Sequence, residues 1–111
     1  MEALKSAIED ARSRYVSANP LSQAADRDAT LHLPGGNTRT IPHFEPFPLT
    51  MVKGNGAELT DLDGHTYVDC VGEYSAALFG HTNEVIVAAI REALDGGVAM
   101  GAPTRFERDL A

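Results

Sequence analysis

Apolar residues recur at helical spacing in the first part of the chain. Over residues 3–18 they stand three or four positions apart and predict an amphipathic helix with these apolar positions: Leu4, Ile8, Ala11, Tyr15 and Ala18. This helix should end at Asn19-Pro20, because proline cannot continue the backbone hydrogen-bond ladder. The alanine-containing stretch that follows, residues 21–30, predicts a short second helix.

The clearest helical pattern covers residues 84–94. Its apolar face consists of five residues: Ile86, Ala89, Ile90, Ala93 and Leu94. Thr82 or Asn83 can cap the N-terminus of this helix, where the charge of Glu84 also suits the helix dipole. Gly96-Gly97 should stop it.

Residues 49–70 read as short strands separated by turns. The pattern predicts a three-stranded antiparallel meander with strands at residues 49–53, 57–60 and 66–70. Gly56 and Gly64 supply the positive φ that the two hairpin turns require. Three strands with one apolar face are near the minimum for stability, so we expect another surface to cover this sheet.

The segment 34–48, which we call the arm, is rich in proline and also contains large apolar side chains: Pro34, Pro42, Pro46, Pro48, Ile41, Phe44 and Phe47. Proline removes backbone donors, so the arm should be extended and irregular. A free linker has little use for apolar side chains. The arm is therefore predicted to lie against another surface.

A further helix should start near the end of the sequence. Thr104 and Glu107 form a capping-box pattern, and Phe106 and Leu110 begin an apolar stripe. Only about two turns follow, which is too short for a helix that is stable alone in water. We expect this helix to continue in a longer polypeptide; a docked terminal turn is the alternative.

Charge and cysteine content narrow the function classes. With 16 acidic and 9 basic residues the net charge is −7, which argues against nucleic-acid binding. No basic run could hold an anionic membrane, and no apolar stretch approaches the length of a spanning helix. Cys70 is the only cysteine, which favours a reducing cytoplasm; we expect it to be a buried, small apolar side chain.

Metal and phosphate sites find little support in the spacing. The acidic turn Asp61-x-Asp63-Gly64 does not fit a calcium loop, because the glycine is fourth instead of sixth. Gly54-x-Gly56 and Gly35-Gly36 fit turns, since neither lies between a strand and a helix. No cysteine pair or helical i, i+4 spacing accompanies the four histidines, His32, His43, His65 and His81. We expect His81 to have a capping or packing role.

Three residues are candidates for substrate binding: Arg39, Tyr74 and Phe79. Arg39 lies in the arm between two threonines, where a guanidinium can bind a carboxylate with two parallel hydrogen bonds. Tyr74 and Phe79 bracket a short stretch of small and apolar residues and could be walls of a pocket. Taken alone, the pattern favours a solvated arginine and two core aromatic residues.

Several short motifs occur in a fixed order and spacing over about residues 15–111. They are Pro34-Gly35-Gly36-Asn37-Thr38-Arg39, Pro46-Phe47-Pro48, Gly56-Ala57-x-Leu59-x-Asp61-x-Asp63-Gly64-x-x-Tyr67-x-Asp69, Gly80-His81, and Gly101-Ala102-Pro103-Thr104 with Glu107. This ordered set resembles the N-terminal region of class III aminotransferases, which use pyridoxal 5′-phosphate (PLP). The resemblance implies an α/β fold of type I, of which the chain covers the N-terminal helix, the connecting arm, the three-stranded meander and the first helix of the small domain.

The resemblance also implies a division of the chain and a set of partners. Residues 1–48 would be the helix and arm, residues 49–100 the meander and helix of the small domain, and residues 101–111 the start of a helix that leads to a large PLP-binding domain. The family forms homodimers. The rest of the polypeptide and a second subunit would then cover the arm and the meander.

Roles follow from the same resemblance. Arg39 matches the arginine that receives the substrate carboxylate, Tyr74 matches an aromatic wall of the substrate pocket, and we place Phe79 in that pocket too. In this family the lysine that carries PLP lies further along the polypeptide, and neither Lys5 nor Lys53 matches it. We therefore expect no catalytic, cofactor-binding or metal-binding residue in this chain, and no activity from the chain alone.

The expected reaction of the whole protein is the transfer of an amino group between an amino acid and a keto acid. Residues 71–74 and 101–104 resemble glutamate-1-semialdehyde 2,1-aminomutase, whereas residues 18–23 and 46–50 resemble aminotransferases of aromatic β-amino acids. An aminomutase typically has a tryptophan where Tyr74 stands, which favours the transaminase. A non-catalytic dimerisation module is the alternative of another class.

Overall fold

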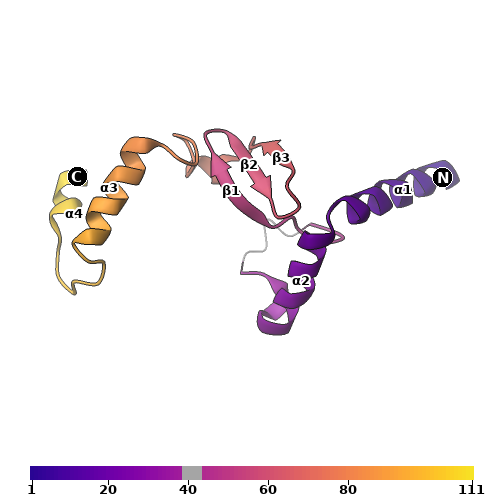
Figure 1. Ribbon diagram of the computed structural model, residues 1–111, viewed down its shortest axis with the longest axis horizontal. Helices are drawn as coiled ribbons and strands as arrows, with labels where there is room; N and C mark the ends of the chain where they lie inside the picture. The colour runs from indigo at the N-terminus through magenta and orange to yellow at the C-terminus, as the bar shows by residue number, and fades with distance from the viewer. Residues whose placement is uncertain (39–43) are drawn as a thin grey trace.

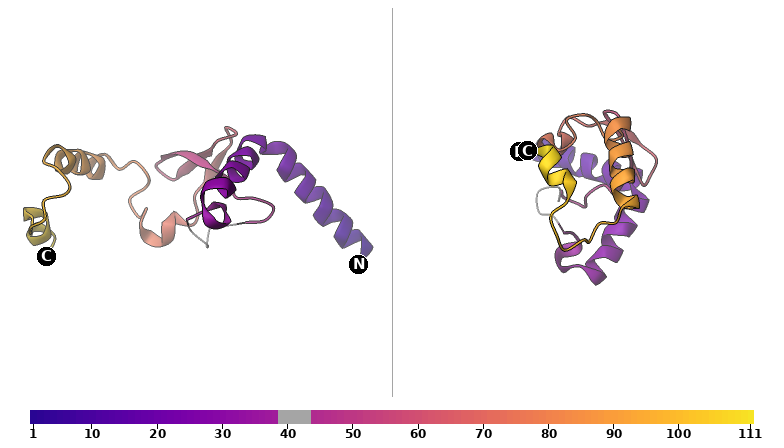
Figure 2. Two further views of the ribbon diagram at one scale, coloured as in Figure 1. Left: turned by 90° about the horizontal axis from the view of Figure 1, so that it is seen from below. Right: turned by 90° about the vertical axis from the view of Figure 1, so that its left-hand side faces the viewer.

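The computed structural model describes residues 1–38 and 44–111, and its elements follow one another along an elongated molecule (Figure 1). The molecule measures 62 × 30 × 25 Å, with a radius of gyration of 19.1 Å. A compact domain of this length would have a radius of gyration of about 13 Å. Figure 2 shows helix α1 (Glu2–Ala18) at one end and helix α4 (Arg105–Leu110) at the other. Most elements therefore contact only their neighbours in the sequence.

Two consecutive helices begin the chain, as the apolar pattern predicts. Helix α1 ends at Ala18, and α2 (Pro20–His32) starts directly after Asn19. Pro20 occupies the first helical position of α2, where the missing N–H has no intrahelical partner to lose. The second helix is confirmed and extends two residues beyond the predicted boundary at residue 30.

A sharp turn follows α2. The 3₁₀ turn η1 (Pro34–Gly36) contains Gly36 at φ 73°, and a Cβ at that position would lie 2.9 Å from the Cγ2 of Thr30. A glycine is needed at this position for both reasons.

The predicted meander is confirmed, with shifted boundaries. Strands β1 (Met51–Asn55), β2 (Glu58–Asp61) and β3 (Thr66–Val68) form an antiparallel sheet in the order β1-β2-β3. The register pairs Asn55 with Glu58 and Leu59 with Tyr67. Both hairpin turns have the expected positive φ, 56° at Gly56 and 91° at Gly64.

The third strand is shorter than its sequence pattern suggests. It ends at Val68, because the side chain of Asp69 accepts hydrogen bonds from the backbone N–H groups of Val71 and Gly72 and turns the chain out of the sheet. Cys70 consequently lies in this turn and is exposed. The prediction that Cys70 is buried is wrong.

The arm contacts helix α1 at Phe47, whereas its first residues form the turn η1 that follows α2. Phe47 is only 2% exposed. Its ring centroid lies 5.1 Å from that of Tyr15, and the Tyr15 hydroxyl donates to the Phe47 carbonyl at 2.7 Å. The predicted packing of the arm is thus confirmed at Phe47.

A buried carboxylate organises the hairpin between β2 and β3. Asp61 is 1% exposed and accepts hydrogen bonds from the His65 backbone N–H at 2.8 Å and from the Tyr67 hydroxyl at 2.8 Å. Its carboxylate also lies 3.0 Å from the His65 ring nitrogen Nδ1. Burial raises the pKa of Asp61, but the hydrogen bonds from Tyr67 and His65 outweigh it and hold this pKa below its ordinary value. Burial and the same carboxylate raise the pKa of Tyr67 to about 12.

Helices α3 (Glu84–Asp95) and α4 complete the chain, both as predicted. The Asn83 side chain caps α3 by accepting from the backbone N–H groups of Val85 at 3.1 Å and Ile86 at 3.2 Å. The capping box of α4 is present, with the Thr104 backbone N–H donating to the Glu107 carboxylate at 3.2 Å.

Apolar surface is left uncovered along the whole molecule. Within residues 1–38 and 44–111, Phe47 is the one buried large apolar side chain. The apolar face of α3 is open to solvent, with Ile86, Ile90 and Leu94 exposed by 43%, 53% and 56%. Exposed apolar surface of this extent is typical of a face that packs against other polypeptide.

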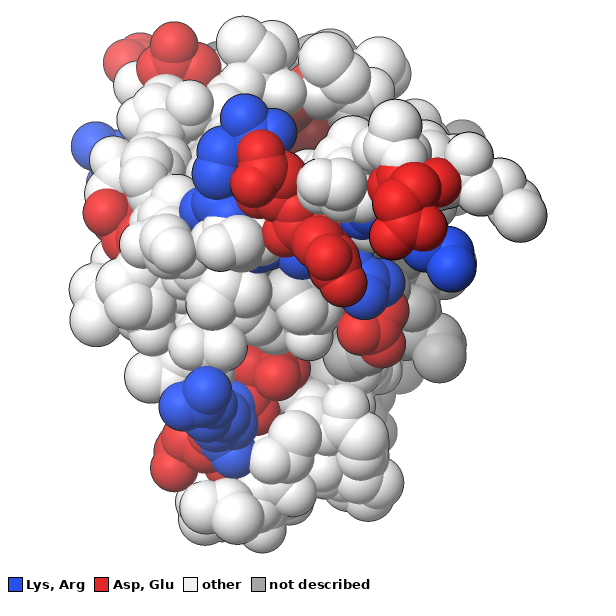
Figure 3. Space-filling view, turned by 90° about the vertical axis from the view of Figure 1, so that its right-hand side faces the viewer, with Lys and Arg blue, Asp and Glu red and all other residues white. Residues whose placement is uncertain are grey.

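Charged side chains of both signs lie next to one another on the face that carries α1 (Figure 3). In the part of the chain that the structure describes, no helix is both long and apolar enough to cross a membrane.

Candidate functional site

The segment between β3 and α3, residues 69–81, contains two of the three candidate substrate-binding residues, Tyr74 and Phe79. It leaves the sheet at Asp69, whose backbone N–H donates to the carbonyl of Ala57 at 2.8 Å. It ends at His81, whose backbone N–H donates to the carbonyl of Gly56 at 2.9 Å. Both ends of the segment are therefore fixed to the same β1–β2 hairpin.

The Asp69 carboxylate connects three points of this segment. One oxygen accepts from the backbone N–H groups of Val71 and Gly72, each at 2.9 Å, and the other lies 2.9 Å from His81 Nε2. The hydrogen bonds from the Gly72 and Val71 amides lower the pKa of Asp69, partial burial raises it by less, and the contact with His81 lowers it further. Asp69 is therefore ionised at neutral pH. The predicted capping or packing role of His81 takes the form of this contact.

Four consecutive residues next to Asp69 have a left-handed backbone. The φ angles are 56° at Gly72, 49° at Glu73, 53° at Tyr74 and 85° at Ser75, and the turn η2 covers Gly72–Ser75. Outside glycine this conformation costs roughly 1–2 kcal/mol per residue, and it rarely occurs in successive residues. Strained backbone of this kind clusters at functional sites, so the turn is a candidate for binding.

Tyr74 and Phe79 are both on the surface of the described chain. Their exposed fractions are 70% and 68%, so neither is a core residue here. Phe79 borders a hollow of about 270 Å³ together with Glu73, His81 and Ile86 of α3. Tyr74 does not line this hollow; it lies on the left-handed turn beside it.

Arg39, the third candidate, lies outside the described residues. Its neighbour Thr38 is the last described residue before it, and Phe44 is the first one after it. Its assignment to the substrate carboxylate stays a prediction.

Sequence reasoning did not single out Asp69 as the organiser of this segment. The sequence contains a signal for it, because an aspartate followed three positions later by a glycine, as in Asp69 and Gly72, is a common turn pattern. The contact between Asp69 and His81, twelve residues apart, carries no local signal.

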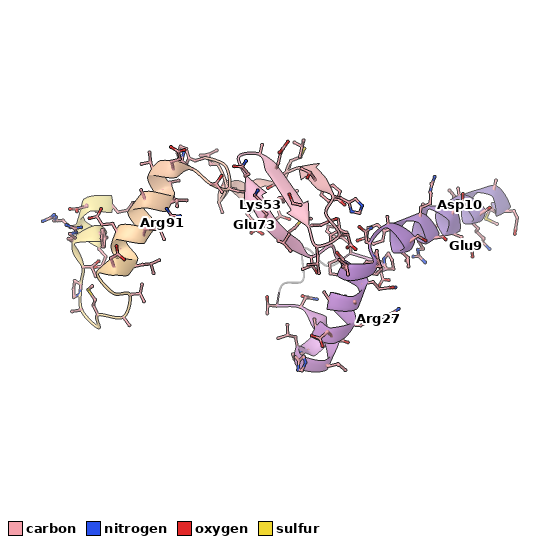
Figure 4. All side chains as sticks on the ribbon, in the orientation of Figure 1. Glu9, Asp10, Arg27, Lys53, Glu73 and Arg91 are labelled. Carbon is pink, nitrogen blue, oxygen red and sulfur yellow. The ribbon has the colours of Figure 1, made fainter. Side chains whose placement is uncertain are left out.

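The described residues do not form a site that fits PLP. A lysine must carry this cofactor, yet Lys5 is exposed on α1 and Lys53 is exposed on β1 (Figure 4). Neither borders the hollow beside Phe79. Within residues 1–38 and 44–111, no three His, Cys, Asp or Glu side chains gather so that they could hold a metal ion.

Comparison with known proteins decides the family. The model of the class-III aminotransferase family matches residues 41–108, more than half of the chain. The chain belongs to the class-III aminotransferase family. Solved relatives include a transaminase with PLP bound and an aminomutase in complex with PMP, so the family implies PLP.

Relatives of this class-III chain include two kinds of enzyme. The β-phenylalanine transaminase of Variovorax paradoxus is 39% identical over 109 residues, which are 98% of this chain and 25% of the relative. Glutamate-1-semialdehyde 2,1-aminomutase 2 of Bacillus licheniformis is 36% identical over 93 residues, 81% of this chain and 22% of the relative. The chain thus spans about a quarter of the length of the curated relatives that it matches.

Solved structures agree with the type I fold. The crystal structure of the β-phenylalanine aminotransferase from Variovorax paradoxus superposes with a TM-score of 0.85 at 39% identity, over 90% of this chain and 23% of that one. A transaminase solved with PLP bound gives a TM-score of 0.78 at 33% identity, over 82% of this chain and 22% of that one. The predicted fold class is confirmed.

Proposed function

We propose that the whole protein is a PLP-dependent transaminase that moves an amino group between a β-amino acid and a keto acid. The observation that carries this proposal is the 39% identity with a β-phenylalanine transaminase over nearly the whole chain. Tyr74, in place of the tryptophan that is typical of aminomutases, supports the same choice. PLP supplies the electron sink for such a transfer, and residues other than those described here would hold it.

The chain's own contribution is to bind the substrate. Arg39 receives the substrate carboxylate with two parallel hydrogen bonds, and Tyr74 and Phe79 are aromatic walls of the pocket. The exposure of Tyr74 and Phe79 supports this role, since neither side chain is used in a core of the described chain.

Substitution of Arg39 in the whole protein tests this function. Arg39→Ala should raise KM for a β-amino acid by the loss of a charged hydrogen bond, about 1.5–3 kcal/mol or roughly ten- to a hundredfold, while KM for an amine without a carboxylate stays unchanged. Arg27→Ala is the matched control, because Arg27 is an exposed arginine on α2 (Figure 4). If Arg39→Ala changed KM equally for the β-amino acid and for the amine without a carboxylate, Arg39 would not bind the carboxylate. A wild-type protein without transaminase activity would disprove the function itself.

Glutamate-1-semialdehyde aminomutase activity is the second candidate, supported by the 36% identical relative. Both activities can be compared on one preparation by supplying either glutamate 1-semialdehyde or β-phenylalanine with a keto acid. The proposal requires turnover of the β-amino acid to exceed that of the semialdehyde.

We also propose a cytoplasmic homodimer. The open apolar face of α3 and the uncovered meander support an assembly in which more polypeptide packs on both. The division of the chain at residues 48 and 100 stays a prediction. Light scattering of the whole protein would detect the dimer, and cell fractionation would test the compartment.

A further inference from the structure

The left-handed turn Gly72–Ser75 needs support from outside itself. Its own backbone hydrogen bonds are all local. They run from the Tyr74 N–H to the Val71 carbonyl at 3.2 Å, from the Ala76 N–H to the Glu73 carbonyl at 3.2 Å, from the Ala77 N–H to the Gly72 carbonyl at 3.0 Å, and from the Leu78 N–H to the Ser75 carbonyl at 3.2 Å. Three successive residues other than glycine adopt a positive φ here. Such a conformation persists only where its surroundings determine it.

Asp69 supplies that support at the start of the turn. One oxygen of its carboxylate accepts hydrogen bonds from the backbone N–H groups of both Val71 and Gly72. These two bonds fix the direction in which the chain enters η2. Hydrogen bonds to an ionised acceptor are about twice as strong as neutral ones. The side chain of Asp69 is only 9% exposed, so water competes little for these bonds.

His81 fixes the other oxygen of this carboxylate. The backbone N–H of His81 is bonded to Gly56, and its ring packs so closely on Gly54 that a Cβ there would lie 2.7 Å from His81 Cβ and Cγ. His81 is thus held by the β1–β2 hairpin. Through His81, the hairpin also sets where Asp69 and the turn lie.

Tyr74 depends on this turn for its place. Within the described residues its side chain makes no hydrogen bond and no ring contact, and it is 70% exposed. The backbone of η2 therefore sets the direction in which the Cα–Cβ bond of Tyr74 points.

We propose that Asp69, together with His81, is a positioning residue that holds the turn Gly72–Ser75 in its left-handed form and so places Tyr74 against the substrate. This inference rests on the proposed function, in which Tyr74 is a wall of the substrate pocket. In this role Asp69 and His81 act through the turn and not through contact with the substrate.

A double-mutant cycle in the whole enzyme tests the inference. Asp69→Ala should raise KM for the β-amino acid roughly tenfold, with kcat changed less, because a misplaced Tyr74 weakens binding. In a Tyr74→Ala background, Asp69→Ala should have no further effect on KM. Additive effects of the two substitutions would overturn the inference, since a general loss of stability does not depend on Tyr74.

Conservative rescue separates positioning from simple folding. Asp69→Asn keeps an oxygen for the Val71 and Gly72 amides and turns an amide N–H₂ toward His81 Nε2, so its KM should return to within about twofold of wild type. If Asp69→Ala fails to fold, His81→Gln replaces it in the cycle, with a smaller KM increase that also vanishes without Tyr74. A KM for Asp69→Asn as high as that of Asp69→Ala would contradict the proposed geometry.

The matched control is Asp63→Ala. Asp63 also accepts two backbone N–H groups, from Leu21 and Ser22, but in a different turn of the same meander. Its removal should lower the melting temperature without a change in KM. A KM increase equal to that of Asp69→Ala would overturn the specific role of Asp69.

Hydrogen exchange gives a readout that is independent of activity. Amide exchange at Val71 and Gly72 should be faster in Asp69→Ala than in the wild type and in Asp69→Asn. Unchanged exchange overturns the inference even in an active enzyme. A wild-type protein that is inactive as a transaminase overturns the proposed function, and with it the substrate role of Tyr74, whatever the exchange at these amides.

Discussion

The carboxylate of Asp63 caps the helix that contains Ser22, although 41 residues separate the two. One Asp63 oxygen accepts the backbone N–H of Ser22 at 2.9 Å, and the other accepts that of Leu21 at 2.7 Å. The first N–H groups of a helix lack partners within it, and a negative charge at this end also suits the helix dipole. The side chain of Asn19, at the N-cap position of α2, makes no capping hydrogen bond. Asp63, in a turn of the meander, therefore caps this helix in its place.

Removal of this cap should loosen the junction between α2 and the sheet. Asp63→Ala is expected to lower the melting temperature of the protein by a few degrees, because two helix N–H groups lose their acceptor. Asp63→Asn should recover part of the loss, since an asparagine side chain can also cap. Thermal unfolding followed by circular dichroism gives the comparison.

Asp28→Ala is the control for this effect. Asp28 is an exposed carboxylate on the same helix, 3.9 Å from His32, with both side chains more than two thirds exposed (76% and 70%). Exposed pairs of this kind contribute little. Equal losses of melting temperature for Asp63→Ala and Asp28→Ala would argue against the capping role.

Phe47 should be the most sensitive apolar position of the arm. Its ring is buried against Tyr15, so Phe47→Ala is expected to lower the free energy of unfolding by about 3 kcal/mol. Phe44 is 65% exposed in the described chain, and Phe44→Ala should cost less than about 1 kcal/mol. Urea unfolding of the two variants would show the difference, and similar midpoints would contradict the packing of the arm through Phe47.

Gly54 should not tolerate a side chain. A Cβ at this position would lie 2.7 Å from two atoms of His81, so Gly54→Ala is expected to destabilise the protein by about 1–3 kcal/mol. Gly96 offers the comparison, since its φ is −81° and a Cβ would lie 3.5 Å from the nearest atom, the carbonyl oxygen of Ala93. Gly96→Ala should be neutral or stabilise by up to about 1 kcal/mol. Denaturant midpoints that move together for both variants would show that the contact with His81 does not limit Gly54.

The sequence predicts the elements whose signals are local. Proline at position 20, the glycines of the hairpin turns and the Thr104–Glu107 capping box each act within a few residues, and the structure has all of them where the pattern indicates. The apolar stripe of α3 is equally local, and it predicts the helix correctly although nothing in the described chain covers it.

Features that depend on distant contacts could not be predicted in this way. The cap on α2 comes from Asp63, and the support of the left-handed turn comes partly from His81, which lies twelve residues after Asp69. The sequence of Glu73-Tyr74-Ser75 contains no glycine and gives no sign of a left-handed backbone. The predictions that the third strand reaches Cys70 and that Cys70 is buried are wrong for a local reason, because the Asp69 turn overrides the β propensity of the residues after Val68.

Acid should destabilise the protein through three carboxylates. The pKa values of Asp61, Asp63 and Asp69 all lie below the ordinary value. At Asp61 and Asp63 burial raises the pKa, but hydrogen bonds outweigh it; they come from Tyr67 and His65 at Asp61 and from Leu21 and Ser22 at Asp63. At Asp69 the main cause is the pair of hydrogen bonds from the Gly72 and Val71 amides. A lowered pKa in the folded state means that the unfolded chain binds protons more readily. The resulting stability is fully present above the unfolded pKa of about 4 and is lost as the pH falls through the folded values.

The slope of this acid transition tests the assignment of the groups. Between about pH 6 and pH 3 the urea midpoint of the wild type should fall, because each of the three carboxylates takes up a proton on unfolding. Asp63→Asn removes one of these protons, so its midpoint should be lower at pH 6 and fall less steeply toward pH 3. Asp28→Asn removes an exposed carboxylate from the same helix and should follow the wild-type slope. If Asp63→Asn and the wild type lost stability in parallel, the hydrogen bonds to Leu21 and Ser22 would not be the source of the acid sensitivity at this position.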